Sequence, residues 1–186
     1  KNSSIKVLIT GASPDRINTN ATLRSYVYAG FASVIGGEQV ANCPLETSVE
    51  FVSRFRPDLI VCFGSCMPDE SEYGPLRDIC DRTGTVIAFW LHDDPYEFDY
   101  SFKAEEVADW IFSNDRWSTL HYQHPKVYHL PMAACPNTHR RTWTATKEND
   151  VFFCGVGFSN RTLLVRDLEK KLESVRTCIK RYTKRR

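Results

Sequence analysis

Five short apolar runs recur along the first 132 residues, and turn residues bound each of them. The runs cover residues 5–9, 59–65, 85–91, 110–113 and 126–132. They are apolar at successive positions instead of alternating with polar residues, a pattern typical of strands in a parallel sheet that is covered on both sides. The pattern therefore predicts an α/β fold, an open parallel sheet of about five strands with helices on both faces.

Amphipathic segments alternate with these runs. The first expected helix lies between the runs at residues 5–9 and 59–65, and its apolar positions recur at helical spacing: Leu23, Val27, Phe31 and Val34. Asn20 is the expected N-cap of this helix, and Gly36 its stop. Pro57 is expected to end a second helix before the next strand, because proline disfavours helical geometry at the residue before it.

A third helix is expected to have Pro75 in its first turn and Gly84 at its end. Beyond residue 136 the periodicity is lost, so residues 1–136 are the predicted first domain and residues 137–149 a linker. Residues 150–186 then read as one further strand and helix followed by a basic tail, "KRYTKRR", that is expected to be mobile.

Composition removes several classes of protein. Lys and Arg total 24 against 23 Asp and Glu, so the net charge of +1 provides no field that would attract nucleic acid, which is an unlikely partner. The basic end of the chain is left as a weak candidate for contact with anionic lipid or nucleic acid. No stretch is long and apolar enough to cross a bilayer and no signal peptide is visible, so a cytoplasmic location is expected.

The seven cysteines are an odd number, and most lie inside apolar runs, as Cys62, Cys80 and Cys154 do. They are expected to be buried free thiols in a reducing compartment. Cys62 and Cys66 form the only close pair, and no second pair of Cys or His follows at zinc-like spacing. Neither a metal site nor a cofactor is therefore expected.

Ligands of open parallel sheets bind beyond the carboxyl ends of the strands, so the residues just after each apolar run are the candidate site. The candidates for lining a cleft are Gly11, Ala12, Ser13, Ser65 and Ser113, and the candidates for catalysis are His92, Asp93 and Asp94. An imidazole beside two carboxylates could act as a general base near neutral pH. The alternative for His92, Asp93 and Asp94 is an ordinary Asp-Pro turn with solvated acids. The turn at Gly11 is expected to have a flexible backbone.

A second candidate site lies in "VFFCGVGFSNR", residues 151–161, where a strand, a glycine turn and a helix start follow one another. This order is a common opening of a nucleotide-binding domain. Its candidates for holding a diphosphate are Gly155, Gly157, Asn160 and Arg161. A solvated surface arginine is the alternative for Arg161. The chain has neither a Gly-x-Ser-x-Gly elbow nor a phosphate-binding Gly-Lys-Ser/Thr loop.

The order of these segments resembles the CgeB-like (spore maturation protein CgeB) glycosyltransferases. The resemblance runs through nearly the whole chain, and its most specific parts are Trp-x-x-Asp-Asp-Pro at residues 90–95 and Gly-x-x-x-x-Asn-Arg at residues 155–161. It implies GT-B architecture, with residues 1–136 as a Rossmann-like N-terminal domain on the acceptor side. Residues 150–186 would then open a truncated C-terminal domain on the donor side.

The resemblance implies transfer of a sugar from a nucleotide-sugar to an acceptor hydroxyl without a metal, with His92, Asp93 or Asp94 as the base of an inverting reaction. The partners would be the nucleotide-sugar, an unknown acceptor and the C-terminal domain of the same enzyme, and the fragment alone would be a poor catalyst. Cys135 stands where the family often has an acid before proline. The alternative is a stand-alone Rossmann-like binding or interaction module whose last strand-helix unit packs on its own sheet edge.

Overall fold

The computed structural model describes residues 5–17, 21–66, 71–139, 150–172 and 177–182. The chain divides into two compact units, Lys1–Arg140 and Arg141–Arg186. Within the described residues, no helix is both long enough and apolar enough to cross a membrane.

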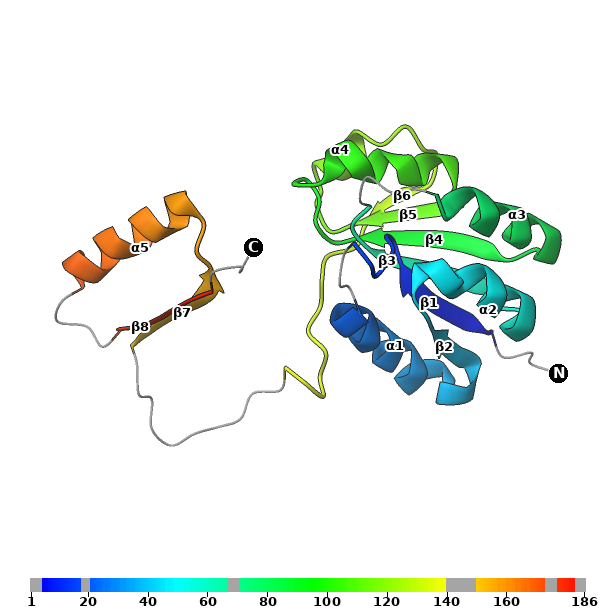
Figure 1. Ribbon diagram of the computed structural model, residues 1–186, viewed down its shortest axis with the longest axis horizontal. Coiled ribbons are helices and arrows are strands. Elements are labelled where there is room, and N and C mark those ends of the chain that lie inside the picture. Colours follow the sequence, from blue (N-terminus) through cyan, green and yellow to red (C-terminus); the bar gives the residue numbers. More distant parts are fainter. Residues whose placement is uncertain (1–4, 18–20, 67–70, 140–149, 173–176, 183–186) are drawn as a thin grey trace. The chain divides into compact units, whose positions relative to one another are not determined.

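A six-stranded parallel sheet forms the centre of the first unit, with the strand order β2-β1-β3-β4-β5-β6 (Figure 1). The strands are β1 Val7–Gly11, β2 Val40–Asn42, β3 Leu59–Gly64, β4 Val86–Leu91, β5 Trp110–Ser113 and β6 Val127–His129. The chain passes outward from β1 in one direction to β2 and in the other direction to β3 and beyond. The unit therefore has the predicted α/β fold and is Rossmann-like in its layers.

Helices lie on both faces of this sheet (Figure 1). They are α1 Ala21–Ile35, α2 Ser48–Phe55, α3 Tyr73–Thr83 and the short α4 Phe98–Ser101, with 3-10 turns η1 Gly37–Gln39, η2 Leu45–Thr47, η3 Phe102–Glu106 and η4 Ser118–Leu120. Among the described elements, α1 packs on one face, whereas α2, α3 and η3 pack on the other. We call these the α1 face and the covered face.

The strands are apolar on both sides because each side faces a different helix layer. Leu8, Ile60 and Phe89 belong to the core of the covered face. Val7 and Val61 belong to the core under α1. Side chains of a strand alternate between the two faces, so a sheet with helices on both sides buries odd and even positions alike.

The ends of the helices follow the predicted signals. Helix α2 ends at Phe55, and Arg56 adopts the left-handed conformation with φ 50° before Pro57. Gly84 ends α3 with φ 72°, and its backbone N–H donates to the carbonyl of Cys80. A residue in this conformation reverses the chain after the last helical turn, and glycine adopts it without a steric penalty.

Two details of the predicted first unit are wrong. The sequence pattern predicts about five strands, whereas the structure adds β2, whose three residues pair with β1 and make too short a run to be recognised. Val34 is 83% exposed, because the buried side of α1 runs through Val27, Phe31 and Ile35 instead. The predicted cap Asn20 lies outside the described residues.

The second unit is a β-α-β unit of β7 Val151–Val156, α5 Ser159–Lys171 and β8 Thr177–Tyr182. The strand and helix at residues 151–171 are as predicted. Residues 180–182 were expected in a mobile tail, but they belong to β8, which pairs in parallel with β7. A basic sequence can form a strand when a neighbouring strand satisfies its backbone hydrogen bonds.

Cys154 of the second unit is exposed, which corrects the prediction that it is buried. One helix packs against this two-stranded sheet, and Val165 is the one buried hydrophobic residue described in the unit. Phe152 and Leu163 are 63% and 61% exposed. Two strands and one helix have too few layers to enclose a core of their own.

Candidate functional site

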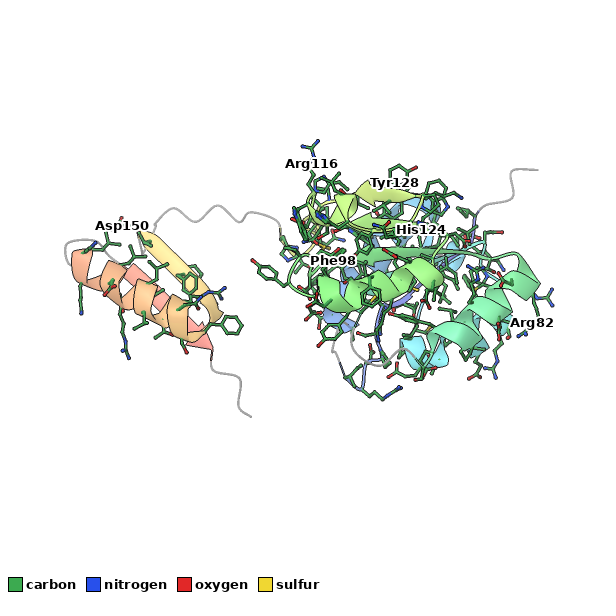
Figure 2. The ribbon with its side chains drawn as sticks, turned by 90° about the horizontal axis from the view of Figure 1, so that it is seen from above. Arg82, Phe98, Arg116, His124, Tyr128 and Asp150 are labelled. Carbon is green, nitrogen blue, oxygen red and sulfur yellow. The ribbon has the colours of Figure 1, made fainter. Side chains whose placement is uncertain are left out.

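The loops that follow β1, β3, β4 and β5 meet at the carboxyl edge of the six-stranded sheet. Backbone hydrogen bonds extend the ladder past the strands, from His92 N to the Gly64 carbonyl at 3.3 Å and from Asn114 N to the Leu91 carbonyl at 3.0 Å. Phe98 and Arg116 mark this end in Figure 2, and Arg82 at the end of α3 marks the opposite one. The edge brings together five of the predicted residues: Ser65, His92, Asp93, Asp94 and Ser113.

His92 and Asp93 form a hydrogen-bonded pair. The His92 Nδ1 atom lies 3.1 Å from Asp93 Oδ1, and Ser65 Oγ donates to Asp93 Oδ2. The hydrogen bond from His92 lowers the pKa of Asp93, and the bond from Ser65 adds to this against the opposing effect of burial. Asp93 is therefore a carboxylate at neutral pH, and its 43% exposed side chain keeps it in contact with water.

The Asp93 carboxylate also selects one form of the imidazole. A carboxylate accepts a proton from Nδ1–H, so the neutral ring has its lone pair on Nε2. The His92 side chain is only 9% exposed, and Nε2 has no hydrogen-bond partner among the described residues. The arrangement can take a proton from a ligand hydroxyl that reaches Nε2 once the covering side chains move aside.

Asp94 has a different environment from its neighbour. It is 2% exposed, and its Oδ2 accepts hydrogen bonds from Ser113 Oγ at 2.7 Å and Tyr122 OH at 2.8 Å. Burial, followed by the nearby Asp94, raises the pKa of Tyr122, which stays a phenol and a donor. Asp94 therefore ties the loop after β4 to β5 and to the segment after η4.

The Gly11 turn is packed rather than flexible, in contrast to the prediction. A Cβ atom at Gly11 would lie 2.6 Å from the Ser13 carbonyl oxygen, which leaves room for glycine alone. Ala12 N donates to the Phe63 carbonyl at 2.9 Å, and Tyr73 OH donates to the Ala12 carbonyl. Because the side chains of Ala12 and Ser13 are fully buried, this turn presents little beyond backbone to a ligand.

A buried arginine beside this turn escaped the sequence analysis. Arg24 of α1 is 4% exposed, and its two Nη atoms donate to the Asp15 carboxylate at 2.7 and 2.9 Å. Its Nε donates to Asn42 Oδ1 at 2.8 Å. The sequence gives little indication that Arg24 is buried, because an arginine in an amphipathic helix ordinarily lies on the solvated side. The contacts join the loop after β1, α1 and β2.

A groove of about 720 Å³ lies between α1 and residues 132–139, and no pattern in the sequence predicted it. Its lining is mainly apolar and includes Tyr26, Gly30, Phe31, Trp90, Met132 and Cys135. The volume lies within the range of small-molecule sites. The available signal was Gly30, an exposed glycine inside a helix, where glycine is unfavourable.

The predicted residues of the second unit lie together at the start of α5. A Cβ atom at Gly155 would lie 3.3 Å from an Nη atom of Arg161, and Arg161 N donates to Asn160 Oδ1 at 2.8 Å. The Arg161 guanidinium lies 5.3 Å from the ring centre of Phe158. Gly157 is in the turn between β7 and α5. The helix start and the guanidinium could together hold an anion.

No group of three or more His, Cys, Asp or Glu side chains in the described part of the chain could hold a metal ion. The chain matches no model of a known protein family, and no curated protein is significantly similar to it in sequence.

Proposed function

We propose that this chain is the acceptor-side half of a GT-B glycosyltransferase, with residues 150–186 opening the donor side. The observation that carries the proposal is the His92–Asp93 pair at the carboxyl edge of the sheet, in which the Nε2 atom of His92 is buried and has no hydrogen-bond partner among the described residues. A buried nitrogen that no described protein group satisfies can pair with a ligand. The resemblance to CgeB-like enzymes supplies the kind of reaction.

In the proposed reaction the acceptor hydroxyl attacks the anomeric carbon of a nucleotide-sugar, and its proton passes to His92 Nε2. The new bond joins the acceptor oxygen to the anomeric carbon, and the bond from that carbon to the diphosphate breaks. The nucleoside diphosphate leaves with the bonding electron pair. Asp93 stabilises the imidazolium that forms, as carboxylates do for catalytic histidines.

His92 is a better base than either carboxylate. Asp93 is a weak base because its pKa is lowered, chiefly by the bond from His92. Asp94 already accepts two hydrogen bonds on Oδ2 and is 2% exposed, so it is better placed to position the loop. These assignments describe an inverting reaction with one base.

The donor side of the proposal rests on the second unit. Arg161 and the start of α5 would neutralise the leaving diphosphate, with Gly155 and Gly157 allowing close approach of the backbone. The C-terminal domain of the same enzyme would complete the donor site. We place the enzyme in the cytoplasm, since the six cysteines whose side chains the structure describes are free thiols, as reducing compartments keep them.

Calorimetric titration of the intact protein from its source with a panel of nucleoside diphosphate sugars tests the proposal. We expect at least one sugar nucleotide to bind. Replacing His92 by Ala should then lower kcat by about 10²- to 10⁴-fold, the usual contribution of a general base. The matched control is His124→Ala, because His124 bonds to the Ala108 carbonyl at 3.1 Å, away from the candidate site (Figure 2).

Absence of binding to every sugar nucleotide would refute the glycosyltransferase. The alternative function, a binding module without catalysis, is favoured by the groove beside α1. An intact mass equal to 21.4 kDa for the natural protein would favour the module.

A further inference from the structure

The groove between α1 and residues 132–139 is suited to a flat apolar group. Phe31 and Trp90 contribute rings to its lining. The Trp90 indole N–H already donates to the Leu130 carbonyl at 3.0 Å, and Ser33 Oγ donates to the Gly30 carbonyl at 2.7 Å. These lining residues therefore offer a ligand mainly apolar contact.

Few polar groups of the groove remain to orient a ligand. The Nδ1 atom of His139 accepts a hydrogen bond from Cys135 N at 2.9 Å, so the neutral ring has its proton on Nε2. Tyr26 packs edge-on against His139, with ring centres 5.3 Å apart, and adds a phenol. An apolar lining with a small number of donors is the usual composition of a small-molecule site.

Gly30 borders the groove without a side chain. It lies inside α1, where glycine destabilises a helix by about 1 kcal/mol relative to alanine. Its φ is not positive, and a Cβ atom there would meet nothing within 4 Å. Neither backbone conformation nor packing within the protein requires glycine at this position. The space above it is part of the groove.

Two aromatic rings, Trp90 and Phe63, lie between the groove and the candidate base. Trp90 lines the groove and packs edge-on against Phe63, with ring centres 5.2 Å apart. Phe63 in turn contacts His92, at 5.1 Å between ring centres. Trp90 and His92 are two positions apart at the end of β4, so an extended backbone directs both toward the α1 face.

We propose that the groove binds an aromatic ring system of the acceptor, so that the acceptor is a hydroxylated aromatic molecule whose hydroxyl reaches His92. The identity of the ligand as an acceptor rests on the proposed glycosyl transfer, whereas the binding itself does not. The ring system would displace water from Trp90 and Phe31, the contact that contributes most to affinity for apolar ligands.

The test uses 2-naphthol, a fluorescent hydroxylated aromatic, titrated into the full chain. Gly30→Phe adds a ring to the α1 wall of the groove, where a Cβ atom meets nothing within 4 Å, and should weaken binding by about tenfold or more. Gly74→Phe is the matched control, because Gly74 is in α3, away from the groove, and a Cβ atom there also meets nothing within 4 Å. It should bind 2-naphthol like the unchanged chain.

Alkylation of Cys135 by iodoacetamide gives a second readout, since Cys135 lines the groove. At 2-naphthol concentrations of about ten times Kd, modification of Cys135 should slow by about tenfold, while that of Cys154 should not change. Peptide mapping by mass spectrometry separates the two sites.

Equal binding to Gly30→Phe and to the unchanged chain, no binding at all, or an unaltered rate at Cys135 would overturn the groove as the site. Binding at the groove by an intact protein that binds no sugar nucleotide would leave the site standing and remove the glycosyltransferase. Binding of sugar nucleotides without binding of 2-naphthol would leave the glycosyltransferase standing and remove the groove as the site.

Discussion

The two faces of the six-stranded sheet differ in how completely they are closed. Helices α2 and α3 and the turn η3 cover one face, and the side chains of Phe89 and Ile111 there are fully buried. On the α1 face, Trp90 is only half-buried and Tyr128 of β6 is 48% exposed (Figure 2). The groove lies on this α1 face.

The same difference separates two residues of the loop after β4, His92 and Asp94. The His92 ring contacts Phe63, and His92 follows Trp90 by two positions, the spacing of side chains on one face of a strand. Asp94 bonds to Tyr122, which belongs to the core of the covered face. We infer that the covered face contributes most of the stability, whereas the α1 face is accessible to ligands.

The largest effect should come from the closed face. Phe89→Ala removes a fully buried ring and should lower the free energy of unfolding by about 3–5 kcal/mol, the transfer and cavity cost of such a change. Tyr128→Ala on the α1 face should cost about 1 kcal/mol or less, because the ring is half exposed. Urea unfolding measures both, and equal losses would show that the two faces are not distinct.

Removing the carboxylate of Asp94 should lower the free energy of unfolding more than removing that of Asp93. Asp94→Ala removes the carboxylate that accepts from Tyr122 OH and leaves Ser113 Oγ with only its longer bond, to the Asp115 carbonyl at 3.2 Å. It should cost about 1–3 kcal/mol in the free energy of unfolding, because both donors are buried. Asp93→Ala should cost less than about 1 kcal/mol, because its carboxylate is 43% exposed and water can replace it as the acceptor for Ser65 Oγ and His92 Nδ1. A larger loss for Asp93 in urea unfolding would contradict the structural role given to Asp94.

The smallest expected effect concerns two thiols under alkaline conditions. Burial, the largest cause, raises the pKa of Cys66 on the covered face to about 12. A folded pKa above the unfolded value of about 8.5 gives stability that is present below pH 8.5 and lost as pH rises toward the folded pKa. The unchanged chain should therefore lose about 1.4 kcal/mol more per pH unit above pH 8.5 than Cys66→Ala does.

Cys135 in the groove is the control for this measurement. Burial acts to raise its pKa, but hydrogen bonds from Thr138 and Asn137 outweigh it, and the net pKa is lowered. Cys135→Ala should therefore not reduce the alkaline loss of stability. Urea unfolding at several pH values between 7.5 and 9.5 gives the slopes, and identical slopes for Cys66→Ala and the unchanged chain would refute the difference.

Much of the first unit follows from local patterns. Five of its six strands, the ends of α2 and α3, and the meeting of Ser65, His92 and Ser113 at one edge could be predicted, because parallel strands place their carboxyl ends together. Strand β2 could not, since three residues carry too little pattern and their conformation depends on pairing with β1.

The candidate site was predicted only as a set of residues. Asp93 pairs with the adjacent His92, whereas Asp94 accepts a hydrogen bond from Tyr122, 28 positions further along the chain. The sequence alone could not show this difference between the two carboxylates. The groove was missed for the same reason, because α1 and residues 132–139 meet only in the folded chain. Cys154 and the basic residues of β8 were misjudged from local composition.

The sequence by itself determined the α/β class and the edge where chemistry is expected, because hydrophobic periodicity and turn residues act over short distances along the chain. Only the tertiary structure decided which carboxylate is buried, that Nε2 of His92 has no described partner, and that Gly30 borders a groove. These properties depend on contacts between segments far apart in sequence, and such contacts exist only once the chain has folded.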